Sequence, residues 1–516
     1  MSENMKTSAS DESPEYRETT LTVDSSMTSA EPRGQGKLSA RERIDLLLDT
    51  GSFVEIGALN RSSHPELKCR TPADGVVCGY GAINGRIVYV SSDDAAVLGG
   101  TRGLVGERKV NRIRDLALKN GKPFVALMEA GAARLQERSG AMAADMGSRF
   151  GSHFRMSGRI PQVAGIMGSA FGGPSFNAAQ SDFTTLVKET GYFGMSGPLI
   201  VKVGIGITVT REEIGGAEVS GVMTGQVDHI GETEQDCLKS IRDFLSFFPD
   251  SCDELPPVIE SRQAPLDTED GRERLRMMLP KRSREAYDMK RILALIVDAG
   301  EFFEYRPFYG PNLITALGRI QGQSVGFVAS NPMVRAGVLD ERTTQKARKF
   351  IDMCDAFHIP LVFICDAPGF LVGPDIEKHR MVSLASRLLN TLYATTVPRI
   401  TIVARKAIGL AYVALGGRVT EPDAIVAWPM AHFDVMGPEA GIELVYGKEI
   451  SKAEDPARRR LEIEEKIKAE SSAHAAAEMG LIDDVIDPVK TREVIIRALR
   501  SSVSRRKPGF KHRIDP

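Results

Sequence analysis

Short apolar runs alternate with amphipathic segments along most of the chain. The continuous runs, each bounded by proline or glycine, predict buried strands at 123–129, 162–168, 361–366 and 399–404. Apolar residues at helical spacing predict helices at 105–119, 141–157, 286–299, 341–356, 379–394 and 452–480. Because strands and helices alternate, we predict an α/β fold in which the buried strands pair in parallel.

Local signals mark the ends of several predicted elements. Ser39 and Glu42 have the spacing of a capping box, so a helix is predicted to begin there and to end by Gly51. The dipeptide Asn84-Gly85 divides the β-branched residues of 75–90, and it favours the positive φ angles of a tight turn. We therefore predict one β-hairpin here and a second at 313–330.

The order of elements repeats at a fixed offset. Four anchors recur 237 residues later: Gly85 as Gly322, Pro123 as Pro360, Pro161 as Pro398 and Gly172 as Gly409. A shorter match, 49–55 against 298–304, is offset by 249 residues, and the difference of 12 from 237 is what a loop insertion between duplicated domains leaves. We therefore predict tandem domains with this layout: a disordered tail at 1–35, a first domain at 36–253, a linker at 254–270 and a second domain at 271–516.

The composition narrows the classes of partner. A chain of 516 residues exceeds what one hydrophobic core supports, which agrees with two domains. Its 66 basic and 68 acidic residues leave a net charge of −2, so we expect no nucleic-acid partner. No apolar run approaches the roughly 18 residues of a membrane helix, so we expect no membrane partner. The six cysteines form no CxxC pair and the N-terminal tail is acidic, which favours a cytoplasmic location without a targeting signal.

Small residues follow the predicted strands, where backbone N–H groups can face a ligand. The segment 129–134 (EAGAAR) follows one strand, and 168–173 (GSAFGG) leaves the next and runs into a predicted helix. Two such turns can converge on one oxygen as an oxyanion hole, in which a single donor contributes about 3 kcal/mol to transition-state stabilisation. The second half has 367–370 and 408–411 at the matching positions, so two holes are predicted. Close packing of helix on strand also requires small residues and stays open as the alternative.

Other catalytic signatures are missing from the sequence. It contains no recognisable Ser-His-Asp or Cys-His triad motif, no HExxH and no GxxxxGK[ST] loop, and its eight histidines are scattered. We therefore expect no metal, and chemistry that depends on backbone donors and on a cofactor with its own reactive group.

Five motifs carry a family resemblance: GKLSARER at 36–43, GAARLQE at 131–137, EIGGA at 213–217, DAPGF at 366–370 and AWP at 427–429. With the duplication, they make the chain resemble the carboxyltransferase (β) subunit of the biotin-dependent acyl-CoA carboxylases, of the propionyl-CoA and acetyl-CoA carboxylase type. The resemblance covers about 36–512. It implies two tandem crotonase-like (ClpP/crotonase) domains of β-β-α superhelical architecture.

The resemblance also implies a reaction, the transfer of CO2 from carboxybiotin to the α-carbon of an acyl-CoA. The ureido anion of biotin then takes the α-proton, so no protein base is needed. The implied donors to the thioester oxygen are Gly131, Ala132, Gly172 and Gly173. The implied donors to the ureido oxygen of biotin are Gly369, Gly409, Leu410 and Ala411. The implied substrate-binding residues are Ala133, Arg134, Pro174, Tyr412 and Val413.

Partners follow from the same resemblance. The chain has no ATP-grasp glycine loop and no Ala-Met-Lys-Met motif for biotin attachment, so biotin carboxylase and the biotin carrier are expected on separate chains. Family members usually form a homohexamer, with each site between the N-domain of one protomer and the C-domain of another.

Some positions depart from the family pattern. Pro174 stands where members carry alanine, and it has no N–H to donate. Ala130 and Ala132 replace the serine and the second glycine of Ser-Gly-Gly-Ala-Arg, Leu410 replaces a glycine, and Val413 occupies a position linked to the choice of acyl chain. Two alternatives therefore stay open: a biotin-dependent acyl-CoA decarboxylase component with a membrane-embedded partner, and a non-catalytic scaffold paralogue.

Overall fold

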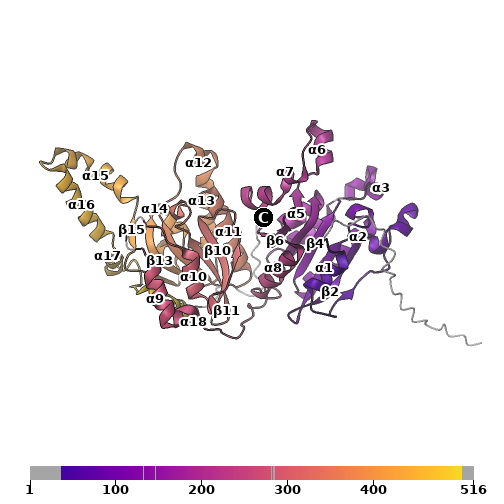
Figure 1. The fold of residues 1–516 in the computed structure, drawn as a ribbon, viewed down its shortest axis with the longest axis horizontal. Coiled ribbons are helices and arrows are strands. Elements are labelled where there is room, and N and C mark those ends of the chain that lie inside the picture. Colours follow the sequence, from indigo (N-terminus) through magenta and orange to yellow (C-terminus); the bar gives the residue numbers. More distant parts are fainter. Residues whose placement is uncertain (1–36, 132, 146, 281, 283–284, 503–516) are drawn as a thin grey trace, which may run out of the picture.

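Two eight-stranded sheets carry the fold, one in each half of the chain (Figure 1). The computed structural model describes residues 37–131, 133–145, 147–280, 282 and 285–502. The first sheet has the order β1-β2-β3-β4-β5-β6-β8, with β7 beside β5, and the second has β16-β14-β13-β12-β11-β10-β9, with β15 beside β13. The strands of the first sheet are β1 Val54–Glu55, β2 Val76–Ile83, β3 Arg86–Asp93, β4 Phe124–Ala130, β5 Gln162–Phe171, β6 Phe183–Val187, β7 Tyr192–Gly194 and β8 His229–Gly231. Those of the second are β9 Phe302–Tyr305, β10 Leu313–Ile320, β11 Gln323–Ser330, β12 Leu361–Ala367, β13 Arg399–Ile408, β14 Ala424–Ala427, β15 His432–Asp434 and β16 Asp484–Val485.

The strands reproduce the sequence repeat. The bounds of β2, β3, β4 and β5 recur 237 residues later as those of β10, β11, β12 and β13. In each half the first two of these strands form an antiparallel hairpin, and the following strands pair in parallel. The turn of the first hairpin has positive φ at Asn84 and Gly85, as predicted. The α/β fold with parallel pairing is thus confirmed.

Helices cover both sheets, joined by short 3-10 turns. Those of the first half are α1 Ala40–Leu47, α2 Leu104–Asn120, α3 Leu135–Arg138, α4 Ser148–Met156, α5 Gly173–Ala179, α6 Pro198–Ile205, α7 Arg211–Gly215 and α8 Glu234–Ser246. Those of the second are α9 Glu269–Met278, α10 Met289–Ile296, α11 Glu341–Ala356, α12 Pro374–Lys378, α13 Met381–Ala394, α14 Gly409–Ala414, α15 Pro438–Lys452, α16 Pro456–Glu470, α17 Ala473–Glu478 and α18 Thr491–Ser501. The capping box of Ser39 and Glu42 begins α1, as predicted.

Two predicted helices are wrong in extent. The helix predicted at 141–157 is split, because Gly147 has φ 91° and α4 begins only after it. The helix predicted at 452–480 comprises α16, α17 and the last residue of α15. Asp455 caps α16, with Pro456 at its first position, and Ser472 caps α17. Both caps give the chain a local reason to start a new helix.

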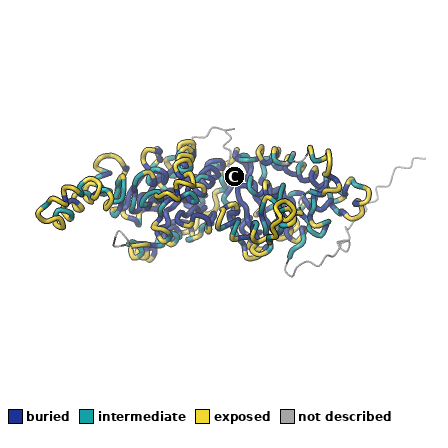
Figure 2. The backbone as a smooth tube through the Cα atoms, turned by 90° about the horizontal axis from the view of Figure 1, so that it is seen from above, coloured by how far each residue is buried: buried dark blue, intermediate teal, exposed yellow. Residues whose placement is uncertain are grey.

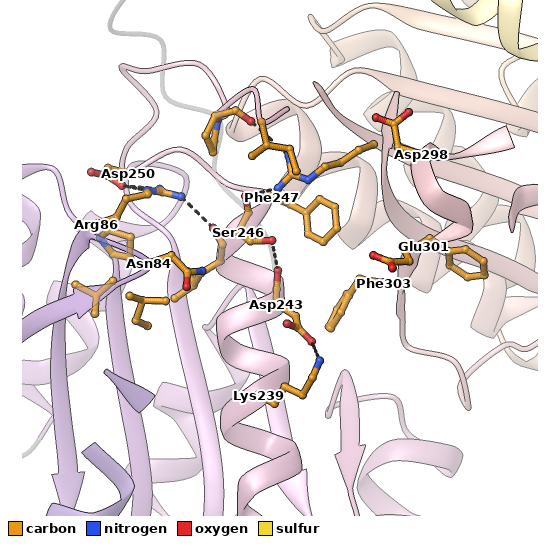
Figure 3. Close-up of a pocket in the computed structure, with 18 of the residues that line it drawn as sticks. Asn84, Arg86, Lys239, Asp243, Ser246, Phe247, Asp250, Asp298, Glu301 and Phe303 are labelled. Carbon is orange, nitrogen blue, oxygen red and sulfur yellow. Dashed lines mark hydrogen bonds and ion pairs between the residues drawn. The ribbon is translucent and has the colours of Figure 1, made fainter. Parts of the chain in front are cut away.

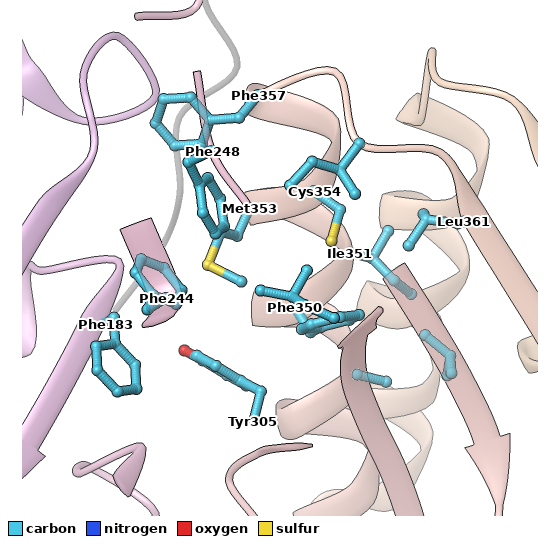
Figure 4. Packing of buried hydrophobic residues seen from close by; sticks show 14 of the residues in the cluster. Phe183, Phe244, Phe248, Tyr305, Phe350, Ile351, Met353, Cys354, Phe357 and Leu361 are labelled. Atoms are coloured by element: carbon cyan, nitrogen blue, oxygen red, sulfur yellow. The ribbon is translucent and has the colours of Figure 1, made fainter. Parts of the chain in front are cut away.

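One hydrophobic core spans the junction of the two halves (Figure 4). Phe183 stacks on Phe244 at 4.5 Å between ring centroids, and Phe248 meets Phe357 edge-on at 5.4 Å. A buried ion pair reinforces the seam, with Arg306 Nε 2.5 Å from Asp228 Oδ1. Figure 2 shows the buried backbone continuing through both halves, while the α15–α16 end is exposed.

The chain between the halves lacks helix and strand at 254–264 and packs on the second hairpin, where the Ile259 N–H donates to Gly322 O at 3.1 Å. Helical structure resumes at Pro265, earlier than the predicted linker end at residue 270. The domain limits stay a prediction, and the predicted tail at 1–35 lies outside the described residues.

Candidate active site

The candidate turns lie at the carboxyl edge of each sheet, just beyond a break in pairing. From Met128 to Ala130 strand β4 advances by two residues, while its partner β5 advances by four, from Ile166 to Ala170. The second half has the same break between Cys365 and Ala367. The extra residues of β5 and β13 form a bulge immediately before the turns, and bulges commonly re-aim the chain next to active sites.

The first turn of the N-terminal half uses part of its backbone internally. The Gly131 N–H donates to Gly100 O at 3.2 Å, and a Cβ at position 131 would lie 2.5 Å from Gly99 O. Glycine is therefore required here for close backbone approach, and its N–H is already bonded, contrary to the donor role expected of it. Ala133 is half-buried and bridges to Arg102, and Ala132 lies outside the described residues.

The second turn of this half leads into α5. Gly172 has φ 68° and donates its N–H to Gly194 O at 3.2 Å, so this expected donor is also bonded within the protein. Gly173 is the first residue of α5, where helix geometry provides no intrahelical acceptor for an N–H. Pro174 is buried at the second position. The Gly173 N–H therefore has no acceptor within its own helix.

The C-terminal half offers a more open arrangement. Gly369 has φ 137° and no heavy atom lies within 4 Å of a Cβ built on it, so its backbone borders open space. Its N–H has no acceptor among the described residues. Beside it, Gly409, Leu410 and Ala411 are the first three residues of α14, and Leu410 is 66% exposed. These N–H groups start a helix and carry its positive end.

Arg134 does not face the turn opening. Its buried guanidinium contacts Asp74 Oδ1 at 2.5 Å, Glu137 Oε1 at 2.8 Å and Thr101 O at 2.8 Å. The same carboxylates accept the N–H groups of Leu104 and Gly106 at the start of α2. Burial raises the pKa of Glu137, but its hydrogen bonds and Arg134 outweigh this and leave the pKa lowered. Arg134 thus supports the start of α2 through these carboxylates, and its expected substrate contact stays a prediction.

Two other expected substrate-binding residues lie on α14. The Tyr412 hydroxyl accepts the Arg418 N–H at 3.0 Å, and its ring meets Phe433 edge-on at 5.5 Å. Burial raises the pKa of Tyr412. Val413 is half-buried on the same helix.

Two carboxylates directly before the turns were not expected to have a role. Glu129 contacts Arg43 and Lys37, and Asp366 contacts Arg405 and Lys406. Positions 129 and 366 are 237 residues apart, so extending the repeat by a few residues would have found them.

A cavity of about 650 Å³ lies elsewhere, between the hairpins of the two halves (Figure 3). Its lining includes Asn84 and Arg86, at the opposite end of the strands from the turns. Its charges are satisfied by protein groups, as Arg86 pairs with Asp250 and Lys239 with Asp243. It is therefore separate from the candidate site.

Metal-binding side chains and membrane-spanning helices both bear on the expected partners. No group of three or more His, Cys, Asp or Glu side chains in the described part of the chain is placed to hold a metal ion. Within the same residues, no helix has the length and apolarity needed to cross a membrane.

A family model for the carboxyl transferase domain matches residues 31–514. The chain belongs to this family. Within it, methylmalonyl-CoA decarboxylase subunit alpha of Veillonella parvula is 37% identical over 475 residues, which are 92% of this chain and 91% of that protein. The carboxyltransferase subunit of propionyl-CoA carboxylase from Haloferax mediterranei is 35% identical over 508 residues, 97% of this chain and 98% of that protein.

The crystal structure of transcarboxylase 12S, a hexamer with methylmalonyl-coenzyme A and methylmalonic acid bound, shares the fold. It has a TM-score of 0.85 and 36% identity, and the match covers 93% of each chain. Together these relatives confirm the predicted carboxyltransferase family, the duplicated crotonase-like fold and carboxyl transfer as the class of activity.

Proposed function

We propose that this chain is the carboxyltransferase subunit of a biotin-dependent acyl-CoA carboxylase and moves CO2 from carboxybiotin to the α-carbon of an acyl-CoA. The observation that carries the proposal is the duplicated pair of turns, in which a strand end and a helix start meet at the carboxyl edge of each sheet. One pair serves each reactant: the thioester in the N-terminal half and biotin in the C-terminal half.

The donors divide between the halves. Gly173, together with Ala132, is assigned to the thioester oxygen, while Gly131 and Gly172 shape the turns because their N–H groups are bonded within the protein. Gly369, Gly409, Leu410 and Ala411 are assigned to the ureido oxygen. Each donor aimed at the developing negative charge contributes about 3 kcal/mol. Carboxybiotin supplies CO2 and, after losing it, the base for the α-proton.

Biotin is proposed to arrive on a separate carrier protein, loaded by a separate biotin carboxylase, in the cytoplasm. We also propose a homohexamer, as in transcarboxylase 12S, in which contacts between protomers would cover the apolar side chains that α6 exposes. No residue of α6 is buried, and Leu199, Val203 and Ile205 are each about 70–80% exposed. In Figure 1, α6 projects from the N-terminal half on the side of the turn leading into α5.

The direct test combines the purified chain with a carboxybiotinylated carrier and a panel of acyl-CoA thioesters. Acyl-CoA-dependent transfer of label from biotin to the thioester is expected. Label that passes from a carboxylated acyl-CoA to the biotin of the carrier, and is released as free CO2 only when a membrane-embedded partner is added, would instead support the decarboxylase alternative, which the similarity to methylmalonyl-CoA decarboxylase subunit alpha favours. Intact oligomers without turnover of any acyl-CoA would leave the scaffold alternative.

The acyl group is the second question. Val413 is proposed to border the acyl chain, and an apolar side chain there suits an apolar acyl group. Replacing Val413 with Asp and comparing kcat/KM across chain lengths tests this assignment. A shift in the preferred chain length is expected, and an unchanged preference would remove Val413 from the acyl pocket.

A further inference from the structure

We propose that the carboxylate one residue before the end of each central strand anchors the adjacent turn, through Arg43 and Glu129 for the acyl-CoA turn and Arg405 and Asp366 for the biotin turn. Glu129 and Asp366 are thus positioning residues, and this inference rests on the proposed function. The anchors act through the backbone, because each carboxylate lies two residues before its turn.

In the N-terminal half the anchor joins three elements. Arg43 of α1 contacts Glu129 Oε2 at 2.6 Å through Nη2, and Glu234 Oε2 at 2.6 Å through Nε. Glu234 is the first residue of α8, and Lys37 contacts Glu129 from the partly exposed side. The Arg43 side chain is only 1% exposed. The end of β4 is therefore tied to α1 and α8 by one buried guanidinium.

In the C-terminal half the anchor is local. Asp366 is fully buried and contacts Arg405 of the neighbouring strand, with Oδ2 at 3.0 Å from Nε and 2.9 Å from Nη2. Its Oδ1 accepts the Lys406 N–H at 3.2 Å. Both basic residues belong to the bulge of β13 opposite Asp366.

The two anchors use different residues at equivalent places. Position 168 corresponds to 405 at the offset of 237, and it is glycine. A Cβ at Gly168 would lie 2.5 Å from Glu129 Cγ, so the longer Glu129 occupies the space of the missing side chain. The N-terminal half lacks the cation on β5 and receives one from α1 instead. The carboxylate at this bulge is thus held in both halves, but by arginines from different elements. This indicates that the position of the carboxylate matters to the turn.

The consequence for catalysis is geometric. Ala132, one of the two donors assigned to the thioester oxygen, follows Glu129 by three residues in the sequence, so a shift of the carboxylate should shift this donor. A displacement of about 1 Å costs up to about 100-fold in rate. Because an oxyanion hole stabilises the transition state more than the bound substrate, the loss should fall on kcat.

The test uses the full chain with the carboxybiotinylated carrier. Glu129→Gln should lower kcat about 30- to 100-fold, with KM for acyl-CoA and for the carrier each within about threefold. Arg41→Gln is the matched control. Arg41 lies on α1, as Arg43 does, but it pairs with Glu55 at the surface and does not contact Glu129. It should leave both constants unchanged.

Transplanting the second anchor into the first half provides the rescue. Glu129→Asp with Gly168→Arg copies the Asp366 and Arg405 pair, and it should recover at least tenfold of the kcat lost in Glu129→Asp alone. Gly168→Arg alone should be inactive or unfolded, because its side chain meets Glu129. A double variant no better than Glu129→Asp would overturn the inference.

If Glu129→Gln misfolds, Lys37→Met tests the anchor instead, because it removes a partly exposed partner of the same carboxylate. It should lower kcat severalfold at an unchanged melting temperature, and an unchanged kcat overturns the anchor. If the wild-type protein shows no acyl-CoA-dependent transfer, the proposed function is wrong and this inference fails with it. If the wild type is active and the anchor variants keep its kcat, only the anchor is wrong.

Discussion

The two halves share a buried support of the sheet and differ at several positions that border the turns. A buried lysine occupies the same place in both: Lys109 Nζ donates to Val76 O and Lys346 Nζ to Leu313 O, each at 2.7 Å. Burial lowers the pKa of Lys346 to about 7. Support for the backbone has thus stayed the same after duplication, while the residues beside the turns have diverged.

The two halves also differ in which backbone N–H groups of the turns are bonded or absent. Position 131 corresponds to Pro368, and the Gly131 N–H is bonded while Pro368 has none. Position 174 corresponds to Ala411, and Pro174 has no N–H. Of the described residues, Gly173 and its equivalent Leu410 stand at the start of a helix in each half and carry an N–H.

The largest effect is expected at Arg134, whose equivalent Leu371 carries no charge. Arg134→Met leaves Asp74 and Glu137 without their cation, and breaking such a buried pair costs about 3–5 kcal/mol. Urea unfolding measures this loss, with Leu371→Met as the matched change in the other half. A loss under 1 kcal/mol would mean that the two halves do not differ in this support.

Next in size is the glycine at position 131. Gly131→Ala should lower kcat by about 100-fold, because the added Cβ collides with Gly99 O and displaces the turn. Pro368→Ala in the second half should change kcat by less than about threefold, because that position already accepts a side chain. Steady-state transfer assays compare them, and equal effects would contradict the assignment of this close approach to the first half.

Asp182 and Asp423 occupy similar places in the two halves but differ in their burial. Each exchanges bonds with the first residue of the adjacent strand, Gln162 or Arg399, but Asp423 is exposed. Burial raises the pKa of Asp182 to about 7, against about 3.9 for an unfolded chain. Its stabilising contribution is therefore complete below the unfolded pKa and is lost as pH rises towards 7.

Asp182→Asn should remove that dependence. The stability of the variant relative to wild type should rise by about 1.4 kcal/mol per pH unit between pH 5 and 6.5. Denaturant unfolding at several pH values measures the trend, and Asp423→Asn serves as the control. If the stability difference between Asp182→Asn and wild type does not change with pH, the Asp182 carboxylate is solvated in the wild type.

The smallest effect is expected at Pro174. Pro174→Ala restores an N–H, but Pro174 is buried at the second position of α5 and the natural turn already has the N–H of Gly173, so the new donor should add little. We expect kcat to change by less than about threefold, measured in the same transfer assay. A tenfold gain would place a ligand at this position and strengthen the scaffold reading of the natural chain.

Much of the fold could be predicted because its signals are local. Asn84-Gly85 specified a hairpin turn, Ser39 and Glu42 specified a helix start, and buried strands appeared as continuous apolar runs. The split of the helix at 141–157 was missed because a single residue, Gly147, decides it through a positive φ. The extent of 452–480 was misjudged because composition concealed the caps at Asp455 and Ser472.

The site was predicted less completely. The small-residue turns were found at the predicted strand ends, but whether an N–H is bonded depends on partners distant in sequence, such as Gly100 for Gly131 and Gly194 for Gly172. The inward direction of Arg134 likewise depends on Asp74, 60 residues away. These relationships arise only when the strands are in register.

The aromatic seam has a consequence for the history of the chain. Phe183, Phe244 and Phe248 are covered by Phe303, Tyr305 and Phe357 of the other half, and each large ring would bare 150–250 Å² if its cover left. Once two ancestral copies shared these rings, either copy alone would expose a large apolar surface to water. Separation of the fused copies would therefore be unfavourable, and later substitutions near one set of turns had to be compatible with the other half.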